Sequence, residues 1–345
     1  MLADAAVVAA AIAAAVVRPP AQWVEDAYVN VFYLRLDTVL RGLTERVPFA
    51  VGDVLLVAVV AALVAWWIRS LRGEARLARV PGLAARTASV VAAVYLWFVA
   101  FWGLCYDRVP VADKVVVTPA HVDTAHVDAF ANRVARMLSQ NVEAAHREST
   151  AHVDPTASLP ARFEAAIGRL GDARPVAMPP VKPTIFNAML ASTGDSGFMD
   201  PWTHEVNVYS GLLFFERPAV FAHEWAHVAG FADESEANYI AVLTCINSPS
   251  ALARYSGWLL VWENLPGTVH VTQRVRPQVV RDIAAIRARL RREVKPAVAR
   301  AQEAAYDRYL RANRVASGID SYRLFVRWMT GATYDAQGLP LVRQR

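Results

Sequence analysis

The chain has 345 residues, of which 55% are hydrophobic, and a formal net charge of +5. Its mean hydropathy of +0.25 is higher than a water-soluble enzyme with one catalytic domain needs, which argues against a purely soluble protein. The two cysteines, Cys105 and Cys245, are too few for a disulfide framework and are expected to be unpaired packing residues.

The first 106 residues carry much of the apolar excess and predict a membrane anchor. Three apolar runs, at about 2–18, 48–68 and 87–106, are predicted to span the bilayer. The first run is short and consists mostly of alanine and valine, so whether it is a true span stays open. Residues 23–46 alternate apolar and charged side chains in a helical pattern, which predicts an interfacial helical segment lying along the membrane surface.

Arginines between the second and third apolar runs predict the orientation of this anchor. They stand against Glu74 alone and supply +4 of the net +5: Arg69, Arg72, Arg76, Arg79 and Arg86. Because positively charged loops stay in the cytoplasm, residues 107–345 are expected outside, as one extracytoplasmic domain. We therefore expect a multi-pass protein of the cytoplasmic membrane that contacts the lipid bilayer, with no nucleic acid as partner.

A turn and a short strand are predicted at residues 198–209. Val206 and Val208 alternate with polar neighbours, as is typical of a strand. Such a segment can line a cleft and bind a peptide as an added strand, although an ordinary edge strand fits the pattern equally well. The polar candidates for contact with a substrate are Thr203, His204, Glu205 and Asn207.

Residues 223–227 have the pattern His-Glu-x-x-His. Side chains four residues apart project from the same face of a helix, so His223 and His227 can bind one metal ion. Glu224 lies on an adjacent face, where it can contact a water held by the metal, which is the position of a general base. Uncharged neighbours such as Phe221 and Trp225 favour a helix buried beneath an active-site cleft over a surface helix.

A tight bend is predicted directly after this helix. Pro218 suits the first helical turn, and Gly230 permits the left-handed residue that ends a helix and reverses the chain. Asp233 or Ser235 can then cap a second helix. This arrangement returns a carboxylate to the two imidazoles.

Three carboxylates compete for the role of third metal ligand: Asp233, Glu234 and Glu236. Glu234 is favoured, because Asn238 then lies one turn further on and can accept a hydrogen bond from a ligating imidazole. Asp233 has a spacing that also suits some zinc peptidases, and it stays the alternative. Glu236 is expected to be a solvated charge near the helix end. The predicted cofactor is Zn²⁺, although the same ligands can take other divalent ions.

A later helical region offers a donor for the oxyanion that forms when a carbonyl group is attacked. Tyr255 is the candidate, although a tyrosine in an aromatic helix more often packs with a satisfied hydroxyl. Further on, residues 274–300 are rich in arginine and have apolar residues at helical spacing. That pattern predicts that the arginines form the solvent-exposed face of an amphipathic helix rather than a phosphate-binding surface.

Over nearly its full length the sequence resembles a bacterial family of multi-pass membrane proteins, catalogued as domain of unknown function 3810, with a gluzincin-type zinc-peptidase motif. The resemblance rests on the stretch 223–238 and on further groups of residues. These are Trp23-Val24-Glu25 with Tyr28; Pro48-Phe49 with Gly52-Asp53; Trp102-Gly103 with Tyr106 and Arg108; Thr203, Glu205 and Asn207; Arg254-Tyr255-Ser256-Gly257; and Tyr309-Leu310 with Asn313, Gly318, Ser321 and Tyr322.

The resemblance implies a membrane-anchored metallopeptidase. Glu234 and Asn238 are similar to the Glu-x-x-Ala-Asp ligand signature of other integral-membrane zinc peptidases, with Asn238 in place of the aspartate. A neutral partner orients an imidazole but raises its basicity less. Two further departures are His204, where the family usually has glycine, and Cys105, where it usually has asparagine.

Together these features predict a mainly α protein. N-terminal transmembrane helices would be followed by a zincin-like, mostly helical metallopeptidase domain with a small β element at the cleft. The predicted function is that of a zinc-dependent endopeptidase acting on a peptide or protein substrate. The alternative is a non-catalytic membrane sensor or scaffold with a zinc-binding site.

Overall fold

The computed structural model describes residues 2–72, 76–118, 123–152, 154–171, 178–312 and 323–343. The chain is mainly helical and divides into two compact units. Unit 1 comprises Met1–Arg108 with Asp200–Glu205, and unit 2 comprises Val109–Met199 with Val206–Arg345. Five positions named from the sequence lie outside the described residues: Glu74, Asn313, Gly318, Ser321 and Tyr322.

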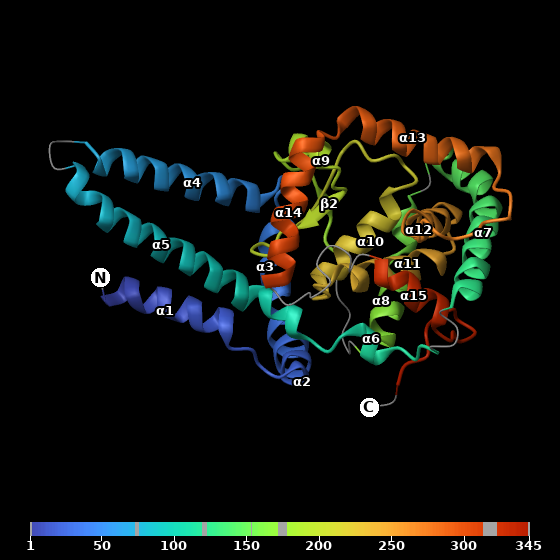
Figure 1. Ribbon diagram of the computed structural model, residues 1–345, viewed down its shortest axis with the longest axis horizontal. Helices are drawn as coiled ribbons and strands as arrows, with labels where there is room; N and C mark the ends of the chain where they lie inside the picture. Colours follow the sequence, from blue (N-terminus) through green and yellow to red (C-terminus); the bar gives the residue numbers. More distant parts are fainter. Residues whose placement is uncertain are drawn as a thin grey trace. The chain divides into compact units, whose positions relative to one another are not determined.

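Unit 1 contains two helices that are long and apolar enough to cross a membrane, α4 (Val51–Ser70) and α5 (Arg76–Phe101). They pack on each other, and α1 (Leu2–Val16) packs along α5 (Figure 1). The second predicted span is close to α4. The third was predicted too late in the sequence, because the apolar part of α5 is Arg79–Phe101 and Gly103–Asp107 forms a 3₁₀ helix, η2.

The first apolar run forms a helix of 15 residues, which is shorter than a span needs. After two prolines the chain continues as α2 (Ala21–Trp23), the π-helix η1 (Val24–Tyr33) and α3 (Leu34–Thr44). The helical stretches before and after the prolines are bent by 108°, and they make a third candidate span only if the bent pair counts as one. The predicted helix at 23–46 is therefore confirmed as helical, while its place at a membrane surface stays a prediction.

Two pairs of oppositely charged side chains are buried in unit 1. Arg108 donates two hydrogen bonds of 3.0 Å to the carboxylate of Glu25, and both residues are buried. Arg41 donates a hydrogen bond of 2.8 Å to the buried Asp37. Such bidentate and charge-assisted contacts offset the loss of hydration that each charge suffers on burial.

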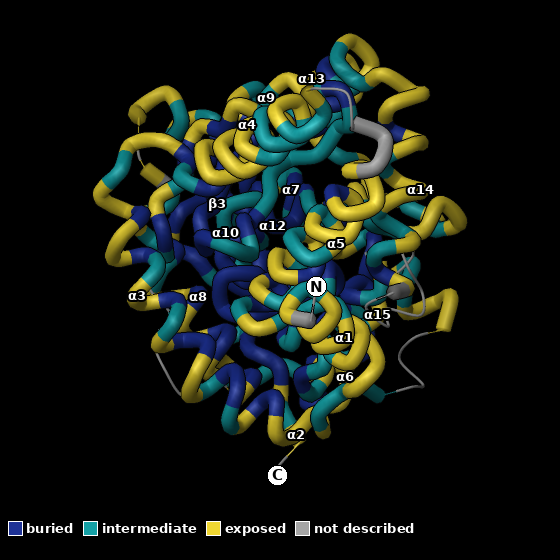
Figure 2. Tube along the Cα trace, turned by 90° about the vertical axis from the view of Figure 1, so that its left-hand side faces the viewer, coloured by how far each residue is buried: buried dark blue, intermediate teal, exposed yellow. Residues whose placement is uncertain are grey.

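Unit 2 is built around α11 (Glu234–Ile246), which is buried along almost its whole length. It packs against α8 (Pro160–Arg169), α10 (Arg217–Val228), α12 (Ala251–Glu263) and α15 (Leu324–Gly331). Figure 2 shows buried residues gathered around α10, α12 and β3. A helix buried on all sides needs such a surrounding layer, because none of its faces is suited to water.

A small sheet lies beside α10. Its strands are β1 (Val181–Lys182), β2 (Gly197–Met199) and β3 (Val206–Val208), in the order β1-β3-β2. β1 runs parallel to β3, and β2 runs antiparallel with Gly197 opposite Val208. The predicted strand around Val206 and Val208 is confirmed. Both β2 and β3 contact α10, and β2 is an edge strand.

The remaining helices cover this core. They are α6 (Val111–Lys114), α7 (Thr124–Thr150), η4 (Pro155–Ser158), α9 (Asn187–Thr193), α13 (Pro277–Glu293) and α14 (Pro296–Ala312). In α13, Val279 and Ile286 are buried while Arg281 and Arg291 are exposed, which confirms the predicted amphipathic helix. Arg289 is an exception to the solvated arginine face, because it is buried and donates to Glu216 at 2.7 Å. Cys105 and Cys245 are both buried and form no disulfide with each other.

Candidate metal centre

The local sequence explains why α10 ends where it does. Pro218 lies in the first turn, where its missing N–H leaves no hydrogen bond unmade. After Val228 the chain reverses at Gly230, whose φ of 81° is in the left-handed region. The backbone N–H of Phe231 donates to the carbonyl of Ala226 at 3.0 Å, closing the helix end. The predicted bend is confirmed.

Asp233 starts the next helix. Its carboxylate accepts hydrogen bonds from the backbone N–H groups of Ser235 and Glu236, so Asp233 is the N-cap of α11. This use as a cap explains why the adjacent Glu234, and not Asp233, extends from the first turn of α11 toward the histidines.

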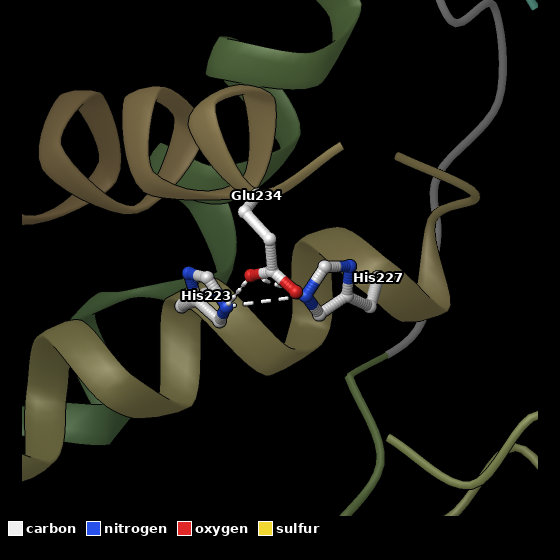
Figure 3. Close-up of side chains that lie close together, drawn as sticks. All are labelled: His223, His227 and Glu234. Atoms are coloured by element: carbon white, nitrogen blue, oxygen red, sulfur yellow. Dashed lines mark hydrogen bonds and ion pairs between the residues drawn. The ribbon is translucent and has the colours of Figure 1, made fainter. Parts of the chain in front are cut away.

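His223, His227 and Glu234 converge at one point (Figure 3). The two Nε2 atoms lie 3.1 Å apart, and Oε2 of Glu234 lies 3.2 Å from Nε2 of His223 and 3.5 Å from that of His227. Among the described residues these three form the group of histidine and acidic side chains that could hold a metal ion.

Hydrogen bonds on the far side of each imidazole fix which nitrogen faces this point. Nδ1 of His227 lies 2.8 Å from the carbonyl oxygen of Phe231, an atom that can only accept, so this nitrogen carries the proton. Nδ1 of His223 lies 2.9 Å from Oδ1 of Asn238 and donates in the same way. Both Nε2 atoms therefore face the Glu234 carboxylate, and with these nitrogens unprotonated this is the orientation that metal-binding histidines require.

The geometry of these atoms fits a zinc ion. With zinc–nitrogen and zinc–oxygen distances of about 2.0–2.2 Å, tetrahedral ligand atoms lie roughly 3.3–3.5 Å from one another. The observed separations of 3.1, 3.2 and 3.5 Å are close to these values. Two imidazole nitrogens and one carboxylate oxygen are also the ligand set of a zinc site that keeps a position open.

The electrostatics favour a positive charge at the same point. Burial alone lowers the pKa of His227, but the carboxylate of Glu234 outweighs it and raises that pKa to about 9. Burial alone would raise the pKa of Glu234, but the two imidazoles outweigh it and hold that pKa well below its usual range. A cation, either a proton or a metal ion, is thus stabilised between these groups.

Glu224 lies on the neighbouring face of α10 and is only 4% exposed. Its Oε2 is buried and accepts no hydrogen bond from any described residue. Burial raises the pKa of the Glu224 carboxyl. β2 passes directly beside it, since a Cβ atom at Gly197 would lie 3.1 Å from Oε1 of Glu224. A side chain at position 197 would crowd this carboxylate and would lie even closer, at 2.8 Å, to the backbone oxygen of Asn207.

Two expectations for nearby residues are wrong. Glu236 is not a solvated charge: it is buried and accepts a hydrogen bond of 2.6 Å from the backbone N–H of Val111. The Tyr255 hydroxyl is not free to stabilise an oxyanion, because the side chain is fully buried and donates to Asp282 at 2.7 Å. Tyr255 has the packing role that was its alternative.

The polar residues of the β2–β3 hairpin, which were predicted to contact a substrate, are buried within the protein. Thr203, His204 and Glu205 belong to unit 1, where all three are buried. Asn207 is the middle residue of β3 in unit 2. Side chains alternate between the faces of a sheet, so Asn207 points away from the face on which Gly197 approaches Glu224. These contacts give no support to a role in binding substrate.

Tyr306, in α14, was not predicted from the sequence. Its hydroxyl donates a hydrogen bond of 2.5 Å to Oε1 of Glu234. The two residues are separated by 72 positions. No motif or periodicity connects them, so only the fold reveals the contact.

Comparisons with known proteins give a family and no function. Neither the curated proteins nor the solved structures contain a match to the chain. A family model described as "Protein of unknown function (DUF3810)" matches residues 28–330, a range that includes His223, Glu224, His227, Glu234 and Tyr306. Since this match covers most of the sequence, the chain belongs to the DUF3810 family.

Proposed function

We propose that the protein is a membrane-anchored zinc peptidase of the zincin type. The observation that carries this proposal is the convergence of His223, His227 and Glu234, with both Nε2 atoms facing the carboxylate, beside a buried Glu224. A purely structural zinc site usually has four protein ligands, whereas this group offers three.

In this proposal the three converging residues hold the ion and Glu224 moves the proton. Zinc, when bound, lowers the pKa of a water molecule toward about 7 and polarises a carbonyl group. Glu224 takes the proton from the attacking water and later gives it to the leaving amine. Its raised pKa suits both steps, because a stronger base accepts the proton more readily and its conjugate acid still returns it.

The position of the edge strand β2 favours a peptide as the substrate. Among the described residues no further strand of the sheet pairs with its outer edge, so its backbone could pair with an extended peptide. Gly197 brings this edge next to Oε1 of Glu224. A peptide added to β2 would therefore have its backbone beside the proposed base.

The anchor agrees with action at the cytoplasmic membrane. α4 and the Arg79–Phe101 part of α5 have the length and composition of membrane spans. The arginines around their connection favour a cytoplasmic position for it. We therefore propose that unit 2 is extracytoplasmic and acts on peptides or proteins there.

The test is the variant Glu224→Gln in the detergent-solubilised full chain, with His227→Ala as the control that removes a ligand. We expect one zinc per wild-type chain, unchanged zinc in Glu224→Gln, and a loss of at least about 10²-fold in the hydrolysis of a quenched-fluorescence peptide library. Little or no zinc should remain in His227→Ala. The peptidase proposal fails if Glu224→Gln cleaves at the wild-type rate or if the wild type binds no zinc.

A second candidate function is a zinc-containing sensor or scaffold without turnover. Asn238 favours it, since a neutral partner raises the basicity of His223 less than an aspartate would. Stoichiometric zinc together with no cleavage of any peptide in the library by the wild type would select this alternative.

A further inference from the structure

The two oxygens of the Glu234 carboxylate have different neighbours. Oε2 lies 3.2 and 3.5 Å from the two imidazole nitrogens, whereas Oε1 accepts the hydrogen bond from the Tyr306 hydroxyl. The oxygen that faces the histidines is thus distinct from the oxygen that Tyr306 contacts.

A carboxylate without such a partner can bind a cation through one oxygen or through both. A hydroxyl that donates to one oxygen withdraws electron density from it and fixes the plane of the group. Outer hydrogen bonds of this kind orient the groups that hold a metal ion and tune its affinity.

Resting on the proposed metal centre, we propose that Tyr306 is a positioning residue that reserves Oε1 of Glu234, so that only Oε2 is offered to the ion. The number of protein atoms available to the metal is then limited to three. This keeps the centre open for water and substrate, as a catalytic rather than a structural site requires.

The rest of α14 holds this hydroxyl in place. Leu310, one turn after Tyr306, is fully buried, and Ala299 near the start of the helix is buried as well. α14 packs on α9, and the Tyr306 ring stacks on that of Tyr309 with the centroids 5.7 Å apart. A hydroxyl carried by an anchored helix loses little freedom on bonding, which makes it suitable for orienting Glu234.

The experiment compares Tyr306→Phe with Tyr309→Phe, which removes the same atom from the other ring of the stacked pair. Both are made in the full chain in detergent, and the metal-free proteins are checked for unchanged thermal midpoints. Zinc affinity is measured by competition with a chromophoric chelator. The visible absorption of the Co²⁺-substituted protein reports the coordination number, because four-coordinate Co²⁺ absorbs more strongly than five-coordinate Co²⁺.

For Tyr306→Phe we expect zinc affinity to fall about 10- to 100-fold and the Co²⁺ band to weaken as Oε1 becomes a ligand. Tyr309→Phe should behave as the wild type in both measurements. Equal affinity and equal spectra for the two variants would overturn the role of Tyr306 while leaving the metal centre standing. Failure of the wild type to bind zinc would overturn the proposed function itself, so the two failures are distinguishable.

Discussion

Unit 1 and the candidate metal centre of unit 2 both bury carboxylates, but the two regions neutralise them differently. In unit 1 the carboxylates of Glu25 and Asp37 accept hydrogen bonds from arginines. In unit 2 the carboxylate of Glu234 faces two imidazole nitrogens whose far sides already hold their protons. The first arrangement is an ion pair complete within the protein, whereas the second favours a positive charge between its groups, either a proton or, as proposed above, a metal ion.

The comparison distinguishes buried charges that serve the fold from buried charges that can bind a ligand. A buried ion pair contributes little net stability but becomes expensive when one partner is removed, because the other is left as an uncompensated charge. The cluster of His223, His227 and Glu234 differs, since binding of a cation between these groups would stabilise the folded protein.

Replacing Arg108 with methionine should break the buried ion pair with Glu25. The buried Glu25 carboxylate would lose both of its 3.0 Å hydrogen bonds. We expect a loss of about 3–5 kcal/mol in stability, seen as a lower thermal midpoint of the detergent-solubilised chain. The double variant Glu25→Gln/Arg108→Met should recover much of this loss. If single and double variants melt together, the ion pair is not the cause.

Replacing Asn238 with aspartate should increase the zinc affinity of the candidate metal centre. The new carboxylate would accept the hydrogen bond from Nδ1 of His223, now 2.9 Å from Oδ1 of Asn238, and increase the basicity of Nε2. We expect zinc to bind about tenfold more tightly by chelator competition. Asn238→Ala, which removes the acceptor, should bind zinc more weakly. An affinity that follows neither direction would mean that this contact does not tune the centre.

Glu148 tests an intermediate case, a carboxylate neutralised by backbone groups. It accepts hydrogen bonds from Ser250 Oγ and from the N–H groups of Ala251 and Leu252 at the start of α12. Burial alone would raise the pKa of Glu148, but these donors outweigh it and lower that pKa. The stability that this interaction contributes is therefore complete above the usual carboxyl pKa of about 4.5 and is lost as the pH falls through the lowered value.

The matching variant is Glu148→Gln. At pH 7 it should be less stable than the wild type by about 1 kcal/mol, as expected for a lost helix cap. The difference in thermal midpoint should shrink at a second, acidic pH, because the wild-type carboxylate becomes protonated as the pH falls through its lowered pKa. A difference that is the same at both pH values would contradict the assigned cause.

The parts of the centre that could be predicted are those that local geometry decides. Helical periodicity places His223 and His227 on one face, and the conformational freedom of glycine identifies the bend at Gly230. The contact between His223 and Asn238 follows from the same local reasoning once Glu234 is on the second helix. The assignment of these residues as zinc ligands stays a prediction.

The parts that could not be predicted depend on contacts between distant segments. Tyr306 reaches Glu234 across 72 positions, and Tyr255 meets its partner Asp282 across 27. Neither pair has a spacing that any single element imposes. His204 is a further example: its φ of 55° is in the region that favours glycine, which suits the family's usual residue, yet its position within unit 1 has no sequence signal.

The β2–β3 hairpin has a consequence for any attempt to separate unit 2 from unit 1 by cutting the chain. Its turn, Asp200–Glu205, belongs to unit 1, while both strands belong to unit 2. A fragment starting at Val109 would keep the strands but lose Val51 and Gly52, whose N–H groups donate to Glu205 at 3.0 and 2.8 Å. Proteolytic release would therefore leave the Glu205 carboxylate, directly before β3, with the Thr203 hydroxyl as donor but without these two backbone N–H groups.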